Sequence, residues 1–444
     1  MIYLSYDRGS VIIQGEMGTP YGQWDPRIQA YRALALYYAD IKTYLEKSKI
    51  LYQDEVLKLL PLPRLRSQLR LRSYQEKALK AWLNAGKRGV IVLPTGAGKT
   101  YIALKAIQML NEPSLVIVPT IDLVEQWRQK LSAEFHIEIG AIAGGEEQIE
   151  PVTVSTYDSA FLRAEQLGNR FMLIVFDEVH HLPAPTFSQI AEMYVAPYRM
   201  GLTATYERED GAHNDLPRLM GGRVFELDVR RLVGTHLSNY SYEKVLVELT
   251  PEEREEYSRE YAIFSSYIRR TGTKLRSAED FHRFIMKTGR DPEARRALLA
   301  RNRALKVVLN SATKINTLGS YLRTYREEKA IIFTRLNELV YTISRRFLIP
   351  AVTHLTPREE RSEILDSFRA GTYKTIVTSQ VLDEGIDVPD ASVAFILSGT
   401  GSSREYIQRL GRILRKKEGK EAKLIEFVAK ETVETRISER RHRS

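Results

Sequence analysis

The sequence predicts an α/β protein with two parallel-sheet halves, and three observations support this fold class. Short apolar segments alternate with helical segments from about residue 64 to 235, and again from about 311 to the end of the 444-residue chain. A glycine-rich turn joins one apolar segment of the first half to a helix, and 43% of the residues are hydrophobic, which is ample for buried cores. Alternation of this kind is typical of a parallel sheet with helices on both faces.

Residues 1–63 are expected to form a small N-terminal α+β domain. Two apolar segments flank Asp7-Arg-Gly-Ser10, which is the pattern of a β-hairpin. A helical stretch is expected from about Ile28 to Ser48, and Pro61-Leu-Pro-Arg64 has the composition of a linker.

The two α/β halves are expected to span residues 64–240 and 311–444, with a helical insertion at residues 250–310 between them. The insertion carries no strand signal and is dense in Glu, Arg, Tyr and Phe. The strands expected in the first half are residues 90–93, 115–118, 152–155, 172–176 and 199–202. Those expected in the second half are residues 330–333, 375–379, 393–397 and 423–427.

The segment Leu93-Pro-Thr-Gly-Ala-Gly-Lys-Thr100 has the context of a phosphate-binding loop, because it follows an apolar run and precedes a helix. Glycines let backbone N–H groups face phosphate oxygens, and the helix N-terminus adds a favourable dipole. We therefore expect ATP with Mg²⁺, with Lys99 at the phosphates and Thr100 at the metal. The residues expected to cradle the nucleotide are Thr95, Gly96, Ala97, Gly98, Lys99 and Thr100.

Two carboxylates follow the buried segment 171–176, where ligands bind at the carboxyl end of a strand. Asp177 suits a group that holds Mg²⁺ through its water shell, and Glu178 suits the base that orients the attacking water. Alone, the pair could equally be a solvated acidic loop. His180 and His181 lack the spacing of a metal site, so we expect them to link the γ-phosphate to neighbouring loops.

Two further segments of the first half carry weaker signals. Arg72 and Gln75 precede the phosphate loop and are candidates for recognition of the adenine base, although they also suit an ordinary polar helix start. Thr203 and Thr205 end another strand, where their hydroxyls can relay the nucleotide state, cap a helix, or do both.

Three of these segments resemble motifs I, II and III of superfamily-two helicases: Thr95–Thr100, Asp177-Glu-Val-His180 and Leu202-Thr-Ala-Thr205. The second of them, followed by Arg208-Glu-Asp210, is similar to the XPB family of DNA helicases. That resemblance implies two RecA-like motor domains, a helical thumb-like insertion and an N-terminal damage-recognition domain. It also implies that Arg208, Glu209 and Asp210 take part in duplex unwinding.

The second half contains a basic segment in which Arg409, Arg412 and Arg415 recur every three residues, close to one face of a helix. The segment resembles helicase motif VI, which implies that Gln408 lies near the γ-phosphate and that Arg412 and Arg415 act as arginine fingers. Residues 378–389 resemble motif V, which implies that Gly385 and Asp387 approach the nucleotide.

The resemblance also implies which residues follow a nucleic-acid backbone, although each of them suits an ordinary cap or turn as well. These residues are Thr120, Thr156, Tyr157, Thr334, Arg335 and Thr378. In the insertion, aromatic side chains among arginines suit base stacking, but at helical spacing most are expected in the core.

Composition indicates the partners and the class of protein. The net charge of +10 favours a polyanionic partner, here DNA, and the absence of cysteine excludes disulfides, thiolate zinc sites and iron–sulfur clusters. No apolar run approaches the roughly 20 residues of a membrane span, and no signal peptide is apparent, so we expect an intracellular, nucleoid-associated protein. The resemblance implies 3′ to 5′ movement, DNA repair and a nuclease partner. The alternatives are an ATP-gated scaffold that opens DNA for that nuclease without processive unwinding, and an RNA helicase.

Overall fold

The computed structural model describes residues 1–15, 18–208, 210–227, 240–275, 278–379, 391–398 and 422–442. The chain divides into two compact units, residues 1–229 and 230–444, and each is described by itself. No helix in these ranges is long and apolar enough to cross a membrane.

The first unit begins with a five-stranded sheet in the order β3-β4-β2-β1-β5. The expected hairpin is confirmed, since β1 and β2 pair antiparallel up to Asp7 opposite Ser10. The expected helix from Ile28 was wrong in its first part: residues 30–34 form β4, which pairs with both β2 and β3, and this pairing overrides the local helical pattern. The elements are β1 Ile2–Asp7, β2 Ser10–Gln14, β3 Gln23–Asp25, β4 Ala30–Leu34, η1 Ala35–Tyr37, α1 Tyr38–Lys47 and β5 Tyr52–Glu55.

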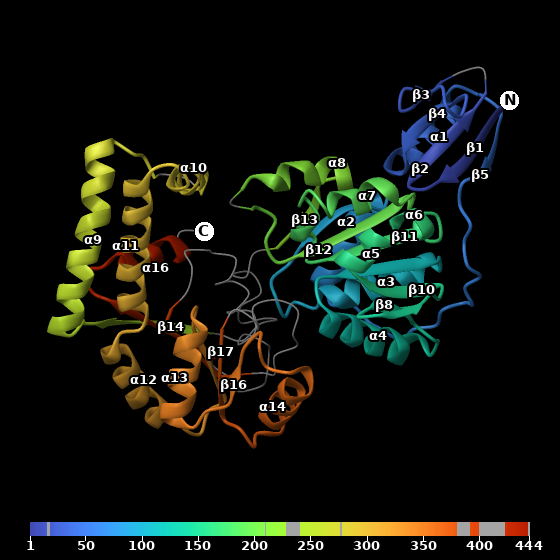
Figure 1. Ribbon diagram of the computed structural model, residues 1–444. Helices are drawn as coiled ribbons and strands as arrows, with labels where there is room; N and C mark the ends of the chain where they lie inside the picture. The colour runs from blue at the N-terminus through green and yellow to red at the C-terminus, as the bar shows by residue number, and fades with distance from the viewer. Residues whose placement is uncertain are drawn as a thin grey trace. The chain divides into compact units, whose positions relative to one another are not determined.

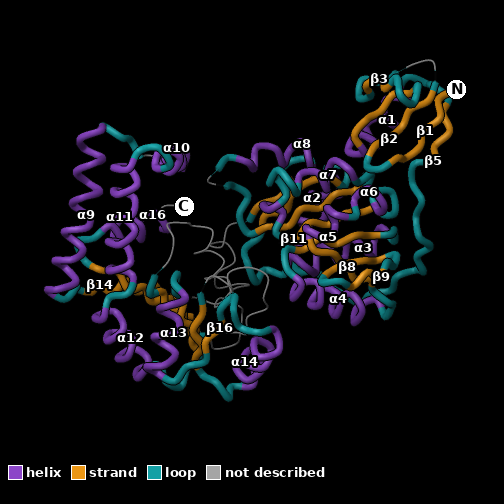
Figure 2. Tube along the Cα trace, viewed as in Figure 1, coloured by secondary structure: helices purple, strands orange, loops and turns teal. Residues whose placement is uncertain are grey.

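An eight-stranded sheet forms the rest of the first unit, in the order β13-β6-β12-β11-β7-β10-β8-β9. All neighbours pair parallel except β8 and β9, and helices cover the sheet (Figures 1 and 2). The strands are β6 Arg88–Val92, β7 Ser114–Val118, β8 Gly140–Ala143, β9 Glu146–Gln148, β10 Val152–Thr156, β11 Leu173–Asp177, β12 Tyr198–Thr203 and β13 Arg223–Glu226. The helices are α2 Ser73–Asn84, α3 Lys99–Leu110, α4 Ile121–Phe135, α5 Tyr157–Leu162, α6 Ala164–Leu167, η2 Val179–His181, α7 Ser188–Met193, η3 Ala212–Asp215 and α8 Leu216–Met220.

The second unit contains a six-stranded parallel sheet in the order β14-β19-β18-β15-β17-β16. Its edge strand β14 was not anticipated from the sequence. The strands are β14 Tyr240–Val247, β15 Ala330–Phe333, β16 Ala351–Val352, β17 Thr375–Thr378, β18 Val393–Ile396 and β19 Ala422–Ala429. The helices beside them are α12 Ala312–Thr324, α13 Asn337–Phe347, α14 Arg358–Ala370 and α16 Val433–His442.

Three helices lie between β14 and α12: α9 Pro251–Thr271, α10 Ala278–Thr288 and α11 Pro292–Leu309. The long helices α9 and α11 lie side by side (Figure 1). Tyr257, Phe264, Tyr267 and Phe284 are buried, so these aromatic side chains form the core of the insertion, as the helical spacing predicted. The predicted fold class is thus confirmed: two parallel-sheet α/β parts, a small N-terminal α+β part and a helical insertion.

Candidate nucleotide-binding site

The phosphate-loop motif joins the end of β6 to the first residue of α3, and two glycines shape it. Gly96 has φ +82° and Gly98 has φ +76°, in the left-handed region that favours glycine. A Cβ atom at Gly98 would lie 2.6 Å from Nε2 of Gln75. Glycine at this position therefore lets the backbone curl tightly at the N-terminus of α3, which carries the free N–H groups and the positive end of the helix dipole.

The N-terminal turn of α2 supports this loop from behind. Nε2 of Gln75 donates to the carbonyl oxygens of Ala97 (3.0 Å) and Gly98 (3.2 Å), and the Tyr74 hydroxyl donates to Ala97 (2.8 Å). Oε1 of Gln75 accepts from the Arg72 amide at 2.8 Å, which closes the first turn of α2. Arg72 and Gln75 thus belong to a polar helix start that contacts the phosphate loop, and their recognition of adenine stays a prediction.

Polar side chains of the loop and of the first turn of α3 lie where phosphates would bind. Nζ of Lys99 donates to the Leu93 carbonyl at 3.2 Å, so the ammonium lies over the start of the loop. Oγ1 of Thr95 is buried and has no hydrogen-bond partner among the described residues. Because a buried hydroxyl without a partner is costly, Thr95 is suited to a ligand that supplies one.

Asp177 is the last residue of β11, and three groups fix its position. Oδ2 accepts from the indole Nε1 of Trp127 at 2.9 Å, and Oδ1 accepts from the Glu178 amide at 3.0 Å. The Tyr157 hydroxyl donates to the Asp177 backbone carbonyl at 3.0 Å. The sequence analysis missed Trp127. A buried indole N–H usually needs an acceptor, which was the available signal, but the sequence does not say which acceptor folding supplies.

Glu178 has a strained backbone, with φ +49°. A non-glycine residue in this region costs roughly 1–3 kcal/mol and is typical of functional sites. Its Oε2 lies 3.4 Å from Nδ1 of His180, and the same nitrogen lies 3.1 Å from Oγ1 of Thr203. The Thr203 hydroxyl also donates to the Thr205 carbonyl at 2.7 Å. These contacts connect the motif II carboxylate to the motif III turn, and the described residues contain no metal-binding cluster of His, Asp and Glu.

Arg208 extends this chain of contacts. Nη1 of Arg208 donates to the His180 backbone carbonyl at 2.5 Å, while Nε and Nη2 bond both carboxylate oxygens of Asp210 at 3.0 and 2.6 Å. The hydrogen bonds from this guanidinium lower the pKa of Asp210 to about 2. Glu209, the middle residue of the proposed unwinding motif, lies outside the described residues.

The predicted nucleic-acid contacts of the first half divide into two kinds. Thr120 and Thr156 are N-cap residues of α4 and α5, whose hydroxyls accept from the amides of Leu123 (3.3 Å) and Ser159 (3.2 Å). Tyr157 is 1% exposed and its ring lies in the core of the large sheet. The Tyr157 hydroxyl thus holds the Asp177 backbone from inside the unit, and a nucleic-acid contact by Tyr157 stays a prediction.

In the second unit, Thr334 and Thr378 lie at the carboxyl ends of neighbouring strands and are fully buried. The Thr334 amide donates to the Thr378 carbonyl at 3.0 Å, and the Arg335 amide donates to Oγ of Ser398 at 2.8 Å. A nucleic-acid contact at these two threonines would therefore use neighbouring groups. The predicted residues Gly385, Asp387, Gln408, Arg412 and Arg415 lie outside the described part of the chain.

Strand register brings the first-half candidates to one edge of the sheet. In the order β6-β12-β11, Thr203 pairs with Val92 and Asp177 pairs with Leu202. All three strands are parallel, so the phosphate loop, the Thr203 turn and the two carboxylates follow their carboxyl ends. Such an edge can bind a nucleoside triphosphate on the loop, with the carboxylates facing a metal ion and a water molecule.

Three protein-family models match the chain. They are described as type III restriction enzyme, res subunit (residues 68–208), helicase conserved C-terminal domain (residues 313–417) and xeroderma pigmentosum group B helicase damage recognition domain (residues 4–56).

Curated proteins with similar sequences carry consistent names. DNA 3′-5′ translocase XPB2 of Sulfurisphaera tokodaii is 45% identical over 99% of this chain and 100% of that protein. DNA 3′-5′ helicase XPB of Mycobacterium tuberculosis is 30% identical over 84% of this chain and 63% of its own. The general transcription and DNA repair factor IIH helicase/translocase subunit XPB/SSL2 of Saccharomyces cerevisiae is 29% identical over 85% and 44%.

Among solved structures, the Hef helicase domain of Pyrococcus furiosus superposes with a TM-score of 0.52. The two sequences are 20% identical, and the superposition covers 83% of this chain and 97% of that domain. The similarity therefore supports the fold alone.

Proposed function

Because the chain belongs to the XPB family of superfamily-two helicases, we propose that it is an ATP- and Mg²⁺-dependent DNA helicase or duplex translocase of the Asp-Glu-Val-His type that moves 3′ to 5′. The observation that carries this proposal is the shared strand edge, where the phosphate loop follows β6 and the two carboxylates lie at the end of β11, the parallel strands on either side of β12. We place its work inside the cell, in DNA repair of the nucleotide-excision type, with transcription as a further setting.

The residues at this edge suit distinct tasks in ATP hydrolysis. Thr100 and Asp177 would hold Mg²⁺, which would neutralise phosphate charge; the fixed carboxylate of Asp177 suits it, because its two neutral donors leave lone pairs for the metal's water shell. Lys99 would bind the β and γ phosphates, and Glu178 would orient the attacking water. By family resemblance, Gln408, Arg412 and Arg415 would stabilise the charge of the transferring phosphoryl group.

One comparison favours a second form of the function. The relative from Sulfurisphaera tokodaii is named a translocase, not a helicase. The chain would then move along duplex DNA, or open it for a nuclease partner, without processive strand separation. Both forms hydrolyse ATP, so only an assay of strand displacement distinguishes the helicase from the translocase.

The decisive experiment is ATP hydrolysis by the wild type and by Glu178→Gln, without nucleic acid and with single-stranded, duplex or forked DNA or with RNA. Displacement of a strand from the fork is measured alongside. We expect DNA-stimulated turnover that falls by 10²-fold or more in the variant, in line with loss of a catalytic base. Glu192→Gln is the matched control, because Glu192 lies on α7 and pairs with Arg218.

Each outcome decides between the forms. Stimulated turnover with displacement supports the helicase, and stimulated turnover without displacement supports the translocase or scaffold. Stimulation by RNA but not DNA, or equal turnover by Glu178→Gln and wild type, would contradict the proposal.

A further inference from the structure

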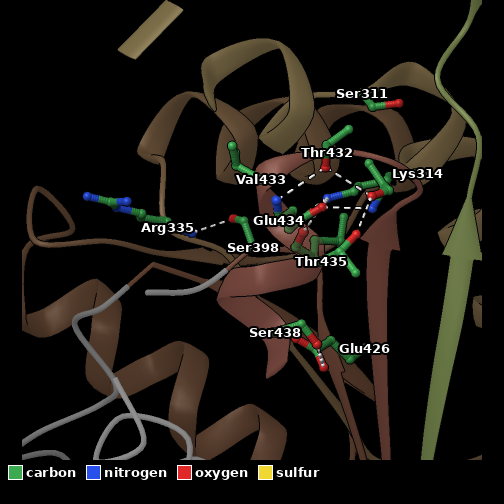
Figure 3. A network of polar contacts seen from close by, with 12 residues as sticks. Ser311, Lys314, Arg335, Ser398, Glu426, Thr432, Val433, Glu434, Thr435 and Ser438 are labelled. Atoms are coloured by element: carbon green, nitrogen blue, oxygen red, sulfur yellow. Dashed lines mark hydrogen bonds and ion pairs between the residues drawn. The ribbon is translucent and has the colours of Figure 1, made fainter. Parts of the chain in front are cut away.

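A buried ion pair joins helices α12 and α16 of the second unit. The side chains of Lys314 on α12 and Glu434 on α16 are 1% and 2% exposed, and Nζ of Lys314 lies 2.5–2.6 Å from both carboxylate oxygens. Nζ also donates to the Leu397 carbonyl at 3.2 Å, and Oε2 of Glu434 accepts from the Ala429 amide at 2.8 Å (Figure 3). The pair therefore holds backbone groups just after β18 and at the end of β19.

On one side, this pair adjoins contacts from the helical insertion. Glu253, in the first turn of α9, accepts hydrogen bonds from the Ser311 hydroxyl (2.9 Å) and the Ala312 amide (2.7 Å). These two residues begin the helix that carries Lys314. The hydroxyl of Tyr257, also on α9, accepts from the Val433 amide at 3.0 Å, directly before Glu434. Helix α9 thus contacts the chain beside each partner of the ion pair.

On the other side, the pair adjoins the strand ends proposed to approach nucleic acid. Lys314 fixes the carbonyl of Leu397, and the next residue, Ser398, accepts from the Arg335 amide and donates to Oγ1 of Thr334 at 3.2 Å. Figure 3 shows Lys314, Glu434, Ser398 and Arg335 in one view of this region. Polar contacts, linked by short stretches of backbone at residues 312–314 and 397–398, therefore lead from α9 to the loop after β15.

Physical chemistry distinguishes this pair from ordinary core packing. Replacing a buried ion pair by apolar side chains of similar volume is often neutral or stabilising, so the pair is a poor means of gaining stability alone. What apolar side chains cannot do is bind the Leu397 carbonyl and the Ala429 amide in a fixed direction. Its particular contribution is therefore orientation of these two backbone groups.

We infer that Lys314 and Glu434 form a positioning pair, which couples the helical insertion to the strand-end residues Ser398, Thr334 and Arg335. Nucleic-acid binding at that edge then depends on the contacts that α9 makes through Glu253. This inference rests on the proposed function, because it takes DNA as the ligand of the edge.

The test uses the full chain with both partners replaced, Lys314→Met with Glu434→Leu. The single variant Lys314→Met leaves a buried carboxylate unpaired and is expected to be unstable, whereas the double apolar variant is expected to fold. Ser438→Ala is the matched control: Ser438 lies on the same helix as Glu434, and its buried hydroxyl donates to Glu426 at 2.9 Å, not to a partner of the ion pair. Thermal unfolding verifies that each variant folds.

The main measurement is the dissociation constant for a fluorescent oligonucleotide by anisotropy, combined with Glu253→Gln in a double-mutant cycle. We expect the apolar pair to weaken binding about fivefold, within the range of measured long-range couplings. We also expect Glu253→Gln to weaken binding in the wild type but to add nothing in the apolar background.

Additive effects, or unchanged affinity in a folded apolar variant, would overturn the inference and leave the pair as core packing. ATP turnover is measured in parallel. A wild type that binds DNA without hydrolysing ATP would overturn the proposed function alone, because the double-mutant cycle of DNA affinities still tests the coupling. A wild type that binds no DNA would overturn both.

Discussion

Two buried carboxylates, Asp177 in the first unit and Glu434 in the second, are held in opposite ways. At the edge of the first sheet, Asp177 accepts from the neutral N–H groups of Trp127 and Glu178 in the described part of the chain. In the second unit, Lys314 and Glu434 neutralise each other inside the protein. A carboxylate held by neutral donors can still face a metal ion, while the carboxylate of a buried ion pair is already matched with a cation. We therefore expect Asp177 to serve ATP hydrolysis and the Lys314–Glu434 pair to serve positioning.

The variant with the largest expected effect is Arg412→Ala, which tests whether the second half also supplies a catalytic group. We expect ATP binding close to wild type and turnover reduced by about 10³-fold or more, because an arginine finger stabilises only the transition state. Nucleotide binding by fluorescence titration and hydrolysis by phosphate release separate the two effects. Lys416→Ala in the same basic segment is the control. Turnover unaffected by Arg412→Ala would mean that the second half supplies no catalytic cation at this position.

A second variant, with a smaller expected effect, tests whether the hydrogen bond from Trp127 orients Asp177 for Mg²⁺. Trp127→Phe removes the N–H group that bonds Oδ2 while keeping an aromatic ring, and we expect turnover to fall by about 10–100-fold, as for partners of metal ligands. The concentration of Mg²⁺ for half-maximal turnover is expected to rise as well.

Trp82→Phe is the matched control for this change. The Trp82 indole is buried and donates to the Arg199 backbone carbonyl at 2.8 Å, so both variants lose one buried hydrogen bond. Similar loss of thermal stability with a difference in turnover would locate the effect at Asp177. Equal turnover in the two variants would show that the indole only stabilises the fold.

The sequence could predict the site residues that lie close together in the chain, but not the partners that lie far apart in it. Lys99 and the glycines of its loop act within a few consecutive residues, as do Asp177 and Glu178, so a local pattern was enough to indicate a nucleotide site. Trp127 reaches Asp177 across 50 residues, and Lys314 reaches Glu434 across 120. Such partners are chosen by strand order and helix packing, which no local pattern states. The mistaken helix at residues 30–34 has the same cause, since pairing with two strands decided its structure.

We propose that Arg208 links ATP hydrolysis to strand separation, and its variant has the smallest expected effect on turnover. Arg208→Ala removes the hydrogen bond to the His180 carbonyl and the pair with Asp210. Because Glu178 and Lys99 are untouched, we expect ATP hydrolysis within about twofold of wild type, but strand displacement reduced roughly tenfold by the loss of a charged hydrogen bond. Arg218→Ala controls for loss of a surface arginine, since Arg218 pairs with Asp215 and Glu192 but not with His180. Full strand displacement by Arg208→Ala would confine the contact with His180 to local structure, whereas loss of hydrolysis in step with displacement would make Arg208 part of the hydrolytic site itself.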